Sequence, residues 1–206
     1  MPAREPEGGA EMAVLMTLEV QGGTTAQYDR TNEILGIAGE NDAPSGLVVH
    51  VCAVTDDGIV VADVWDSVGS LDSFARDRLG PALADVGMSD GTIRTMPVHE
   101  LLFGTGTEPN VLVLLEAPGL TTDEYDAIVA KMPSHAGGSE TYPAVMLAAT
   151  EEPEGFRIAA LWDSEAAYME FATRELLPAV GDPRHFVLRA WPVYSCRGLT
   201  AARAAG

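Results

Sequence analysis

The chain has 206 residues, of which 47% are hydrophobic, and it carries a formal net charge of −19 at pH 7. A chain of this length and hydrophobicity can bury a substantial core, which excludes disorder over most of its length. The acidic charge repels phosphate backbones and anionic lipid surfaces, and no basic patch offsets it. The sequence therefore predicts neither a nucleic-acid partner nor a membrane partner.

The cysteine content and the N-terminal segment predict a cytoplasmic protein. Cys52 and Cys196 are two thiols in a long chain, which fits a reducing compartment better than a disulfide scaffold. Residues 1–11 lack the basic and apolar regions of a signal peptide, and no apolar run approaches the ~20 residues of a membrane-spanning helix. We expect residues 1–11 and 197–206 to be flexible ends.

The first half of the chain predicts the order strand, helix, strand, strand, helix, strand. Thr24 or Thr25 caps the first helix, with Gln27 placed for a capping box, and Asp66-Ser67 caps the second helix. An Asp-Gly pair between the second and third strands predicts a tight hairpin, because glycine accepts a positive φ. The predicted strands are Met12–Val20, Leu47–Val54, Ile59–Trp65 and Thr92–Leu101.

The second half of the chain repeats the first. Val14–Leu83 aligns without a gap on Val111–Val180, and roughly 20 of about 70 residue pairs are identical. Trp65 recurs as Trp162, each followed by Asp-Ser, and the same order of elements follows. The predicted strands of the second half begin at Val111 and continue with Val145–Thr150, Phe156–Trp162 and His185–Cys196. The sequence therefore predicts a tandem duplication.

The predicted strands are apolar on both faces, as Leu47–Val54 and Val111–Leu115 show. Two helices per repeat can cover only one face of a sheet, so the other face is expected to pack on the sheet of the second repeat. The predicted fold class is α+β. Two tandem ferredoxin-like βαββαβ repeats, 12–102 and 110–196, joined by a linker over 103–109, pack their antiparallel sheets into one barrel within the chain.

A series of residues in the first repeat carries a family resemblance: Gly46, His50, Gly58, Asp63–Ser67, Phe74, Arg78–Leu83 and Pro97–His99. This pattern resembles the dimeric α+β barrel superfamily that includes antibiotic-biosynthesis monooxygenases, and within it an uncharacterised actinobacterial family. In that superfamily two subunits close a barrel, so the resemblance implies a monomer with an internal pseudo-dimer, while a homodimer of whole chains stays open. The superfamily hosts several activities, so the fold does not select one.

His50, Asp63 and Trp65 are the candidate site residues on the second and third strands. Alternation puts Asp63 and Trp65 on one face of their strand, and we expect that face to meet the cavity between the sheets, with His50 projecting into the same space. A histidine beside a carboxylate is a general base near neutral pH. The second repeat has Leu147 and Ala160 at these two positions, so one half keeps the pair. The alternative is a hydrogen-bonded structural histidine.

Arg94 and Arg189 occupy the same fourth-strand position in the two repeats. A guanidinium there can hold a carboxylate or a developing enolate, which makes Arg94 a candidate catalytic residue and Arg189 a candidate substrate-binding residue. The alternative is an ion pair with Glu19 and Glu116, which also recur. Both interpretations stay open at this point.

The remaining candidate substrate-binding residues are aromatic or polarisable: Trp65, Trp162, Trp191, Met96, Tyr194 and His99. Such residues line pockets for aromatic ligands, and the alternative is that they are core or rim residues. Tyr28 and Tyr125 are expected to pack in the first helices with their hydroxyl groups at the surface.

Three functions follow from the residues and the resemblance. The first is a cofactor-independent monooxygenase or cyclase that acts on an aromatic or polyketide-like molecule, with no metal and no cofactor, because metal-ligand spacings and nucleotide loops are missing from the sequence. The second is a non-catalytic binding or assembly module. The third is haem binding, which the resemblance disfavours because Phe74 and Phe171 stand where haem-degrading relatives carry a histidine on the second helix.

Overall fold

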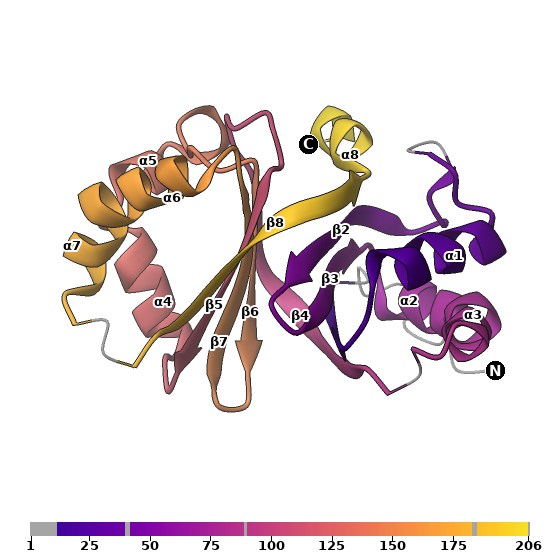
Figure 1. Cartoon of the computed structure of the whole chain (residues 1–206). Helices are drawn as coiled ribbons and strands as arrows, with labels where there is room; N and C mark the ends of the chain where they lie inside the picture. The colour runs from indigo at the N-terminus through magenta and orange to yellow at the C-terminus, as the bar shows by residue number, and fades with distance from the viewer. Residues whose placement is uncertain (1–11, 40–41, 89, 183–184, 206) are drawn as a thin grey trace, which may run out of the picture.

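The computed structural model describes residues 12–39, 42–88, 90–182 and 185–205 (Figure 1). The first repeat consists of β1 (Val14–Gln21), α1 (Thr25–Leu35), β2 (Leu47–Thr55), β3 (Gly58–Trp65), α2 (Val68–Phe74), a π-helical turn (Ala75–Leu79), α3 (Gly80–Asp85) and β4 (Thr92–Phe103). The N-terminal segment 1–11, expected to be flexible, lies outside the described residues.

The second repeat has the same order of principal elements. It consists of β5 (Val111–Pro118), α4 (Thr122–Val129), α5 (Pro133–Ala136), a 3-10 turn (Gly138–Glu140), β6 (Met146–Glu152), β7 (Gly155–Trp162), α6 (Glu165–Phe171), a π-helical turn (Ala172–Leu176), α7 (Leu177–Val180), β8 (Val187–Arg197) and α8 (Leu199–Ala205). No helix in the described part of the chain is both long and apolar enough to cross a membrane.

The strands form one closed antiparallel barrel in the order β1-β3-β2-β8-β5-β7-β6-β4. The predicted α+β barrel is therefore confirmed. The fourth strand of each repeat crosses between the halves, because β4 pairs first with β1 and then with β6, while β8 pairs first with β5 and then with β2. Figure 1 shows β8 running from the second half across to the first. Each crossing strand therefore delivers its C-terminal residues to the other repeat.

The barrel interior is filled by small and branched apolar side chains from both repeats, among them Val49, Val51, Leu112 and Leu114. On β3 the interior-facing residues are Val60, Ala62 and Val64, whereas Trp65 packs in the layer between the sheet and the first-repeat helices. The expectation that Asp63 and Trp65 face the space between the sheets is wrong. Alternation identifies residues that share a face, but close packing between two sheets admits only the smooth apolar face.

The helices α1, α2 and α3 cover the outer face of the first sheet, and α4, α6 and α7 cover that of the second (Figure 1). The predicted capping box is confirmed: the Thr24 side chain accepts a hydrogen bond from the backbone N–H of Gln27, whose side chain in turn accepts from the backbone N–H of Thr24. Thr121 and Glu124 repeat this arrangement at the start of α4. These caps fix where α1 and α4 begin.

The C-terminal segment differs from the expected flexible tail. Arg197 ends β8 and the residues after it form α8, which packs against the barrel core through Leu199 and Ala202. The Arg203 guanidinium donates to the carbonyl oxygens of Gly104, Gly106 and Val145. These hydrogen bonds hold α8 against the connection between the repeats. They are strong because the donor, a guanidinium group, is charged.

Candidate functional site

A pocket lies between the outer face of the first sheet and the helices that cover it. About 670 Å³ among its lining side chains is free of protein atoms, and part of this space is open solvent. Most of its wall is apolar, with side chains that include Met16, Leu18, Trp65, Phe74, Leu83 and Met88. Its polar lining residues include Tyr28, His50, Asp63 and Arg197. We call this space the first pocket. A mostly apolar pocket with a few convergent polar groups is typical of a small-molecule site.

Four of the polar side chains of the first pocket, Asp63, His50, Tyr28 and Arg197, form one hydrogen-bonded chain. Asp63 Oδ1 lies 2.7 Å from His50 Nδ1, and His50 Nε2 lies 2.7 Å from the Tyr28 hydroxyl oxygen. Arg197 Nη1 donates to the same hydroxyl oxygen at 2.9 Å. Because Asp63 accepts from Nδ1, the neutral imidazole is left with Nε2 as an acceptor for the Tyr28 hydroxyl proton. We call this set the polar chain.

The strand register explains why the polar chain forms. His50 on β2 pairs directly with Asp63 on β3 and, on its other side, with Arg197 on the crossing strand β8. Three neighbouring strands therefore put three polar residues in one row on the helix-covered face. Arg197 belongs to the second repeat in sequence, so the first pocket is completed by the other half of the molecule.

Burial controls the ionisation of two groups on this face. Burial raises the pKa of Tyr28, while hydrogen bonds with Ser195 and Asn32 and the positive charge of Arg197 act in the opposite direction. Burial and the nearby Asp63 charge raise the pKa of Cys52 to about 12. Cys52 therefore stays a thiol at neutral pH and does not act as a nucleophile. The Tyr28 hydroxyl keeps its proton at rest and donates it within the polar chain.

Trp65 adds a further hydrogen-bond donor to the first pocket. Its side chain is fully buried, and the indole Nε1–H has no hydrogen-bond partner among the described residues. A buried donor without a partner is costly and invites a ligand acceptor. Trp65 therefore has a specific use in the pocket besides its apolar surface.

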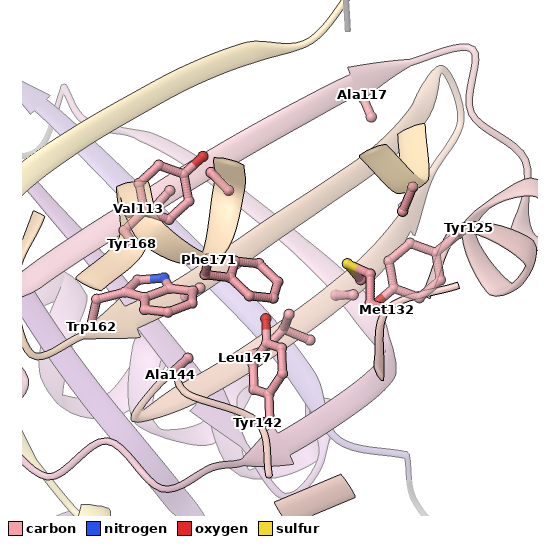
Figure 2. Packing of buried hydrophobic residues seen from close by; sticks show 14 of the residues in the cluster. Val113, Ala117, Tyr125, Met132, Tyr142, Ala144, Leu147, Trp162, Tyr168 and Phe171 are labelled. Atoms are coloured by element: carbon pink, nitrogen blue, oxygen red, sulfur yellow. The ribbon is translucent and has the colours of Figure 1, made fainter. Parts of the chain in front are cut away.

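A second pocket lies at the equivalent place in the second repeat. About 620 Å³ among its lining side chains is free of protein atoms, and part of this space is open solvent. Figure 2 shows the aromatic side chains that gather there. The second pocket is lined by Val113, Tyr125, Met132, Tyr142, Trp162, Tyr168 and Phe171, among others. The strand positions that hold Asp63, His50 and Arg197 in the first pocket correspond to Ala160, Leu147 and Leu102 here. Leu147 pairs with both Ala160 and Leu102. The row that is polar in the first repeat is therefore apolar in the second.

The polar groups beside the second pocket are connected in another order. The Tyr125 hydroxyl donates to Glu100 at 2.6 Å, and His135 Nε2 lies 3.0 Å from the same carboxylate oxygen. Burial, together with the Glu100 charge, raises the pKa of Tyr125 far above its ordinary value. Although burial opposes it, the bonds from His135 and Tyr125 lower the pKa of Glu100. Tyr125 is thereby held as a protonated donor.

The two candidate arginines lie away from both pockets. Arg189 donates to Glu116 at 2.6 Å, and Arg94 lies 3.7 Å from the same carboxylate. Arg157, which is 1% exposed, bridges Glu116 at 2.8 Å and Glu152 at 2.7 Å. Of the two interpretations that the sequence left open, the geometry favours the ion pair over contact with a ligand in the first pocket.

Four other candidates also lie outside the first pocket. Tyr194 donates to Asp29 at 2.8 Å on the surface, and His99 lies 2.9 Å from Asp126. Trp191 stacks under the Arg189 guanidinium at 5.6 Å. Met96 pairs with Leu15 across β1 and β4. Trp162 lies in the second pocket and Trp65 in the first, so the structure separates two residues that the sequence assigned to one pocket.

Sequence reasoning missed Tyr28 and Arg197. Tyr28 was expected to pack with its hydroxyl group at the surface, but the residue is 5% exposed and the hydroxyl lies in the polar chain. Arg197 was expected in a flexible tail but ends β8. One signal was available in the sequence: Arg197 aligns with an apolar residue, Leu102, as His50 aligns with Leu147. Each of His50, Asp63 and Arg197 is therefore matched by an apolar residue in the other repeat, although Arg197 lies in the second repeat and the other two lie in the first.

The surroundings of His50 in the first pocket do not suit haem ligation. Both ring nitrogens of His50 are engaged, one by Asp63 and one by Tyr28, so an iron ion would have to displace one of these bonds. The described residues also include no cluster of three or more His, Cys, Asp or Glu side chains arranged for a metal ion. Neither haem nor a metal ion therefore fits the residues of the first pocket.

No family model and no curated protein matches this chain. Among solved structures, the chain is similar to a "putative monooxygenase" from Lactobacillus acidophilus NCFM, with 10% identity, a TM-score of 0.66, and 91% of this chain and 96% of that chain covered. It is also similar to an anthrone oxidase-like protein, with 16% identity, a TM-score of 0.54, and 91% and 93% covered. At these identities the similarity shows a shared fold.

Proposed function

We propose that the protein is a monooxygenase-like or cyclase-like enzyme that acts on an aromatic, polyketide-like small molecule in the first pocket, without a cofactor. The observation that carries this proposal is the polar chain at one side of an otherwise apolar pocket. The shared fold with a "putative monooxygenase" and an anthrone oxidase-like protein supports it. We further propose that the enzyme works in the cytoplasm as a single chain.

The proposed chemistry begins with removal of a proton from the substrate. Because both nitrogens of His50 are engaged, a substrate reaches the imidazole through the Tyr28 hydroxyl. The Tyr28 oxygen takes the substrate proton while the Tyr28 proton passes to His50 Nε2, and Asp63 stabilises the resulting imidazolium. Arg197 stabilises negative charge on the Tyr28 oxygen during the transfer, whereas the sequence interpretation had an arginine, Arg94 or Arg189, stabilise an enolate of the substrate.

The rest of the pocket suits an aromatic anion. The apolar wall excludes water, which strengthens the electrostatic interactions around the reacting group. The unpartnered indole N–H of Trp65 can donate to a substrate oxygen. A carbanion or enolate formed here can attack a carbonyl within the same molecule, which is a cyclisation, or can react with O₂. In the second case the reacting carbon is a CH₂ group, and after loss of the first proton O₂ adds to this carbon as a peroxide. The second hydrogen then leaves as a proton while the O–O bond breaks, so the carbon becomes a carbonyl and the other oxygen leaves as water.

A substrate panel tests the proposal. Anthrones, hydroxynaphthoquinones and linear poly-β-ketones are incubated with the protein while oxygen consumption and product mass are recorded. Turnover of at least one compound is expected, and the variants His50→Asn and Asp63→Asn are expected to lower it by about 10²–10⁴-fold. Asp126→Asn is the matched control, because Asp126 also lies beside a histidine but outside the first pocket. Full turnover in His50→Asn would contradict the proposed role of the polar chain, whereas binding without turnover throughout the panel would favour a binding module.

A further inference from the structure

We propose that the second pocket is a separate binding site for a neutral aromatic molecule that carries one hydrogen-bond acceptor, and that Trp162 recognises this acceptor. Its lining residues come mainly from the strands of the second sheet and from the helices α4, α6 and α7, which cover that sheet in Figure 1. The site holds its ligand without reacting it. The inference rests on the second pocket alone and stands whether or not the first pocket is catalytic.

Trp162 supplies the recognition element. It is 1% exposed and lines the second pocket, and its indole Nε1–H has no hydrogen-bond partner among the described residues. The indole packs against Phe171 at 5.1 Å and edge-to-face against Tyr168 at 5.5 Å, as Figure 2 shows, so its neighbours are rings rather than oxygen acceptors. Burial of a donor without an acceptor is unfavourable, and a ligand oxygen relieves it.

The lining of the second pocket selects a neutral ligand. No Asp, Glu, Lys, Arg or His lines it among the described residues. Burial raises the pKa values of Tyr142 and Tyr168, and burial with the Glu100 charge raises that of Tyr125, so all three hydroxyl groups stay protonated. A charged ligand would enter without a counter-charge, which is costly in an apolar cavity.

The aromatic walls select a flat ligand. Tyr142 meets Phe171 edge-to-face at 5.5 Å, and Phe171 lies tilted against Trp162 at 5.1 Å. Rings in such arrangements offer faces and edges to another aromatic system. The two positions that carry His50 and Asp63 in the first pocket are Leu147 and Ala160 here, so the bound molecule meets no proton acceptor of the polar chain type.

The test uses the full chain and 9-fluorenone, a neutral three-ring ketone with one acceptor and no acidic proton. Fluorene, which has the same rings without the carbonyl group, is the matched ligand. Binding is measured by calorimetry and by the change in tryptophan fluorescence, and fluorenone is expected to bind in the second pocket. Trp162→Phe is expected to weaken fluorenone binding there about tenfold and to leave fluorene binding unchanged, because the ring stays and the N–H goes. Equal effects on both ligands would overturn the role of Trp162.

Two blocking variants locate the site. Ala160→Phe fills the second pocket and is expected to abolish fluorenone binding there, while Val61→Phe fills the first pocket and is expected to leave it unchanged. The proposal is overturned by fluorenone binding that survives Ala160→Phe, by loss of all binding in Val61→Phe, or by no binding to the parent chain. Thermal unfolding verifies that each variant is folded, and Trp162→Phe decides the outcome if Ala160→Phe does not fold. Fluorenone cannot be deprotonated, so its binding is independent of the proposed enzymatic function.

Discussion

The two halves of the molecule carry the same three kinds of polar group in a different order. Beside the first pocket the order is carboxylate, imidazole, hydroxyl, in Asp63, His50 and Tyr28. Beside the second pocket a carboxylate stands in the middle, and Glu100 accepts from both His135 and Tyr125. In the first order Nδ1 of His50 faces Asp63 and Nε2 faces the Tyr28 hydroxyl, whereas in the second the Tyr125 hydroxyl donates directly to Glu100. We propose that this order decides whether a tyrosine proton can move.

The largest expected effect comes from giving the first pocket the residues of the second. His50→Leu with Asp63→Ala is expected to lower turnover about 10²–10⁴-fold, because the proton acceptor is removed. Ligand binding is expected to persist, since both members of the pair are replaced by apolar groups together. Steady-state turnover and calorimetric binding are measured on the same preparation. Turnover within threefold of the parent would show that the polar chain is not catalytic.

The next effect concerns an asymmetry in the barrel itself. Arg157 occupies the position of Val60 in the first repeat and lies between Glu116 and Glu152. Arg157→Val is expected to lower the free energy of unfolding by about 1.5–3 kcal/mol, because the half-buried Glu152 and Glu116 each lose a charged hydrogen bond while Glu116 keeps its bond from Arg189. Urea denaturation measures the change. A loss below about 1 kcal/mol would mean that water already solvates these carboxylates.

A smaller effect is expected when Arg197, at the end of the crossing strand β8, is replaced by an apolar residue. Arg197→Leu installs the residue of the second repeat, Leu102, and removes a charged hydrogen bond of about 1.5–3 kcal/mol. Turnover is expected to fall about 10- to 100-fold. The pKa of Tyr28 is expected to rise further, because the positive charge that lowers it is gone. Ultraviolet difference titration of the tyrosines follows this change, and an unchanged alkaline titration would contradict the electrostatic role.

The smallest effect is a pH dependence of stability. The raised pKa of Cys52, about 12 in the folded protein, means that the folded state binds more protons than the unfolded state above the ordinary thiol pKa. Stability from this group is present below about pH 8.5 and is lost as the pH rises toward 12, at up to about 1.4 kcal/mol per pH unit. Cys52→Ala, which installs the second-repeat residue Ala149, is expected to show a shallower decline in urea denaturation between pH 8 and pH 10.5. Parallel curves would contradict this.

The sequence predicted the barrel and the His50–Asp63 contact because both depend on local periodicity and on the duplication. It misassigned the direction of that face, since a period of two identifies residues on one side of a strand without saying which side is inside. Tyr28 and Arg197 were missed because they meet only in the folded barrel, 169 residues apart in sequence. Such a contact depends on where β8 crosses, and no local pattern contains that information.

The most direct test of the account compares two equivalent tyrosines. Tyr28→Phe and Tyr125→Phe remove the same hydroxyl group from the same helix position in the two repeats. With any compound that the parent turns over, Tyr28→Phe is expected to lower kcat by about 100-fold or more, while Tyr125→Phe keeps it within about twofold. Equal losses in both variants, or a loss confined to Tyr125→Phe, would contradict the assignment of chemistry to the first pocket.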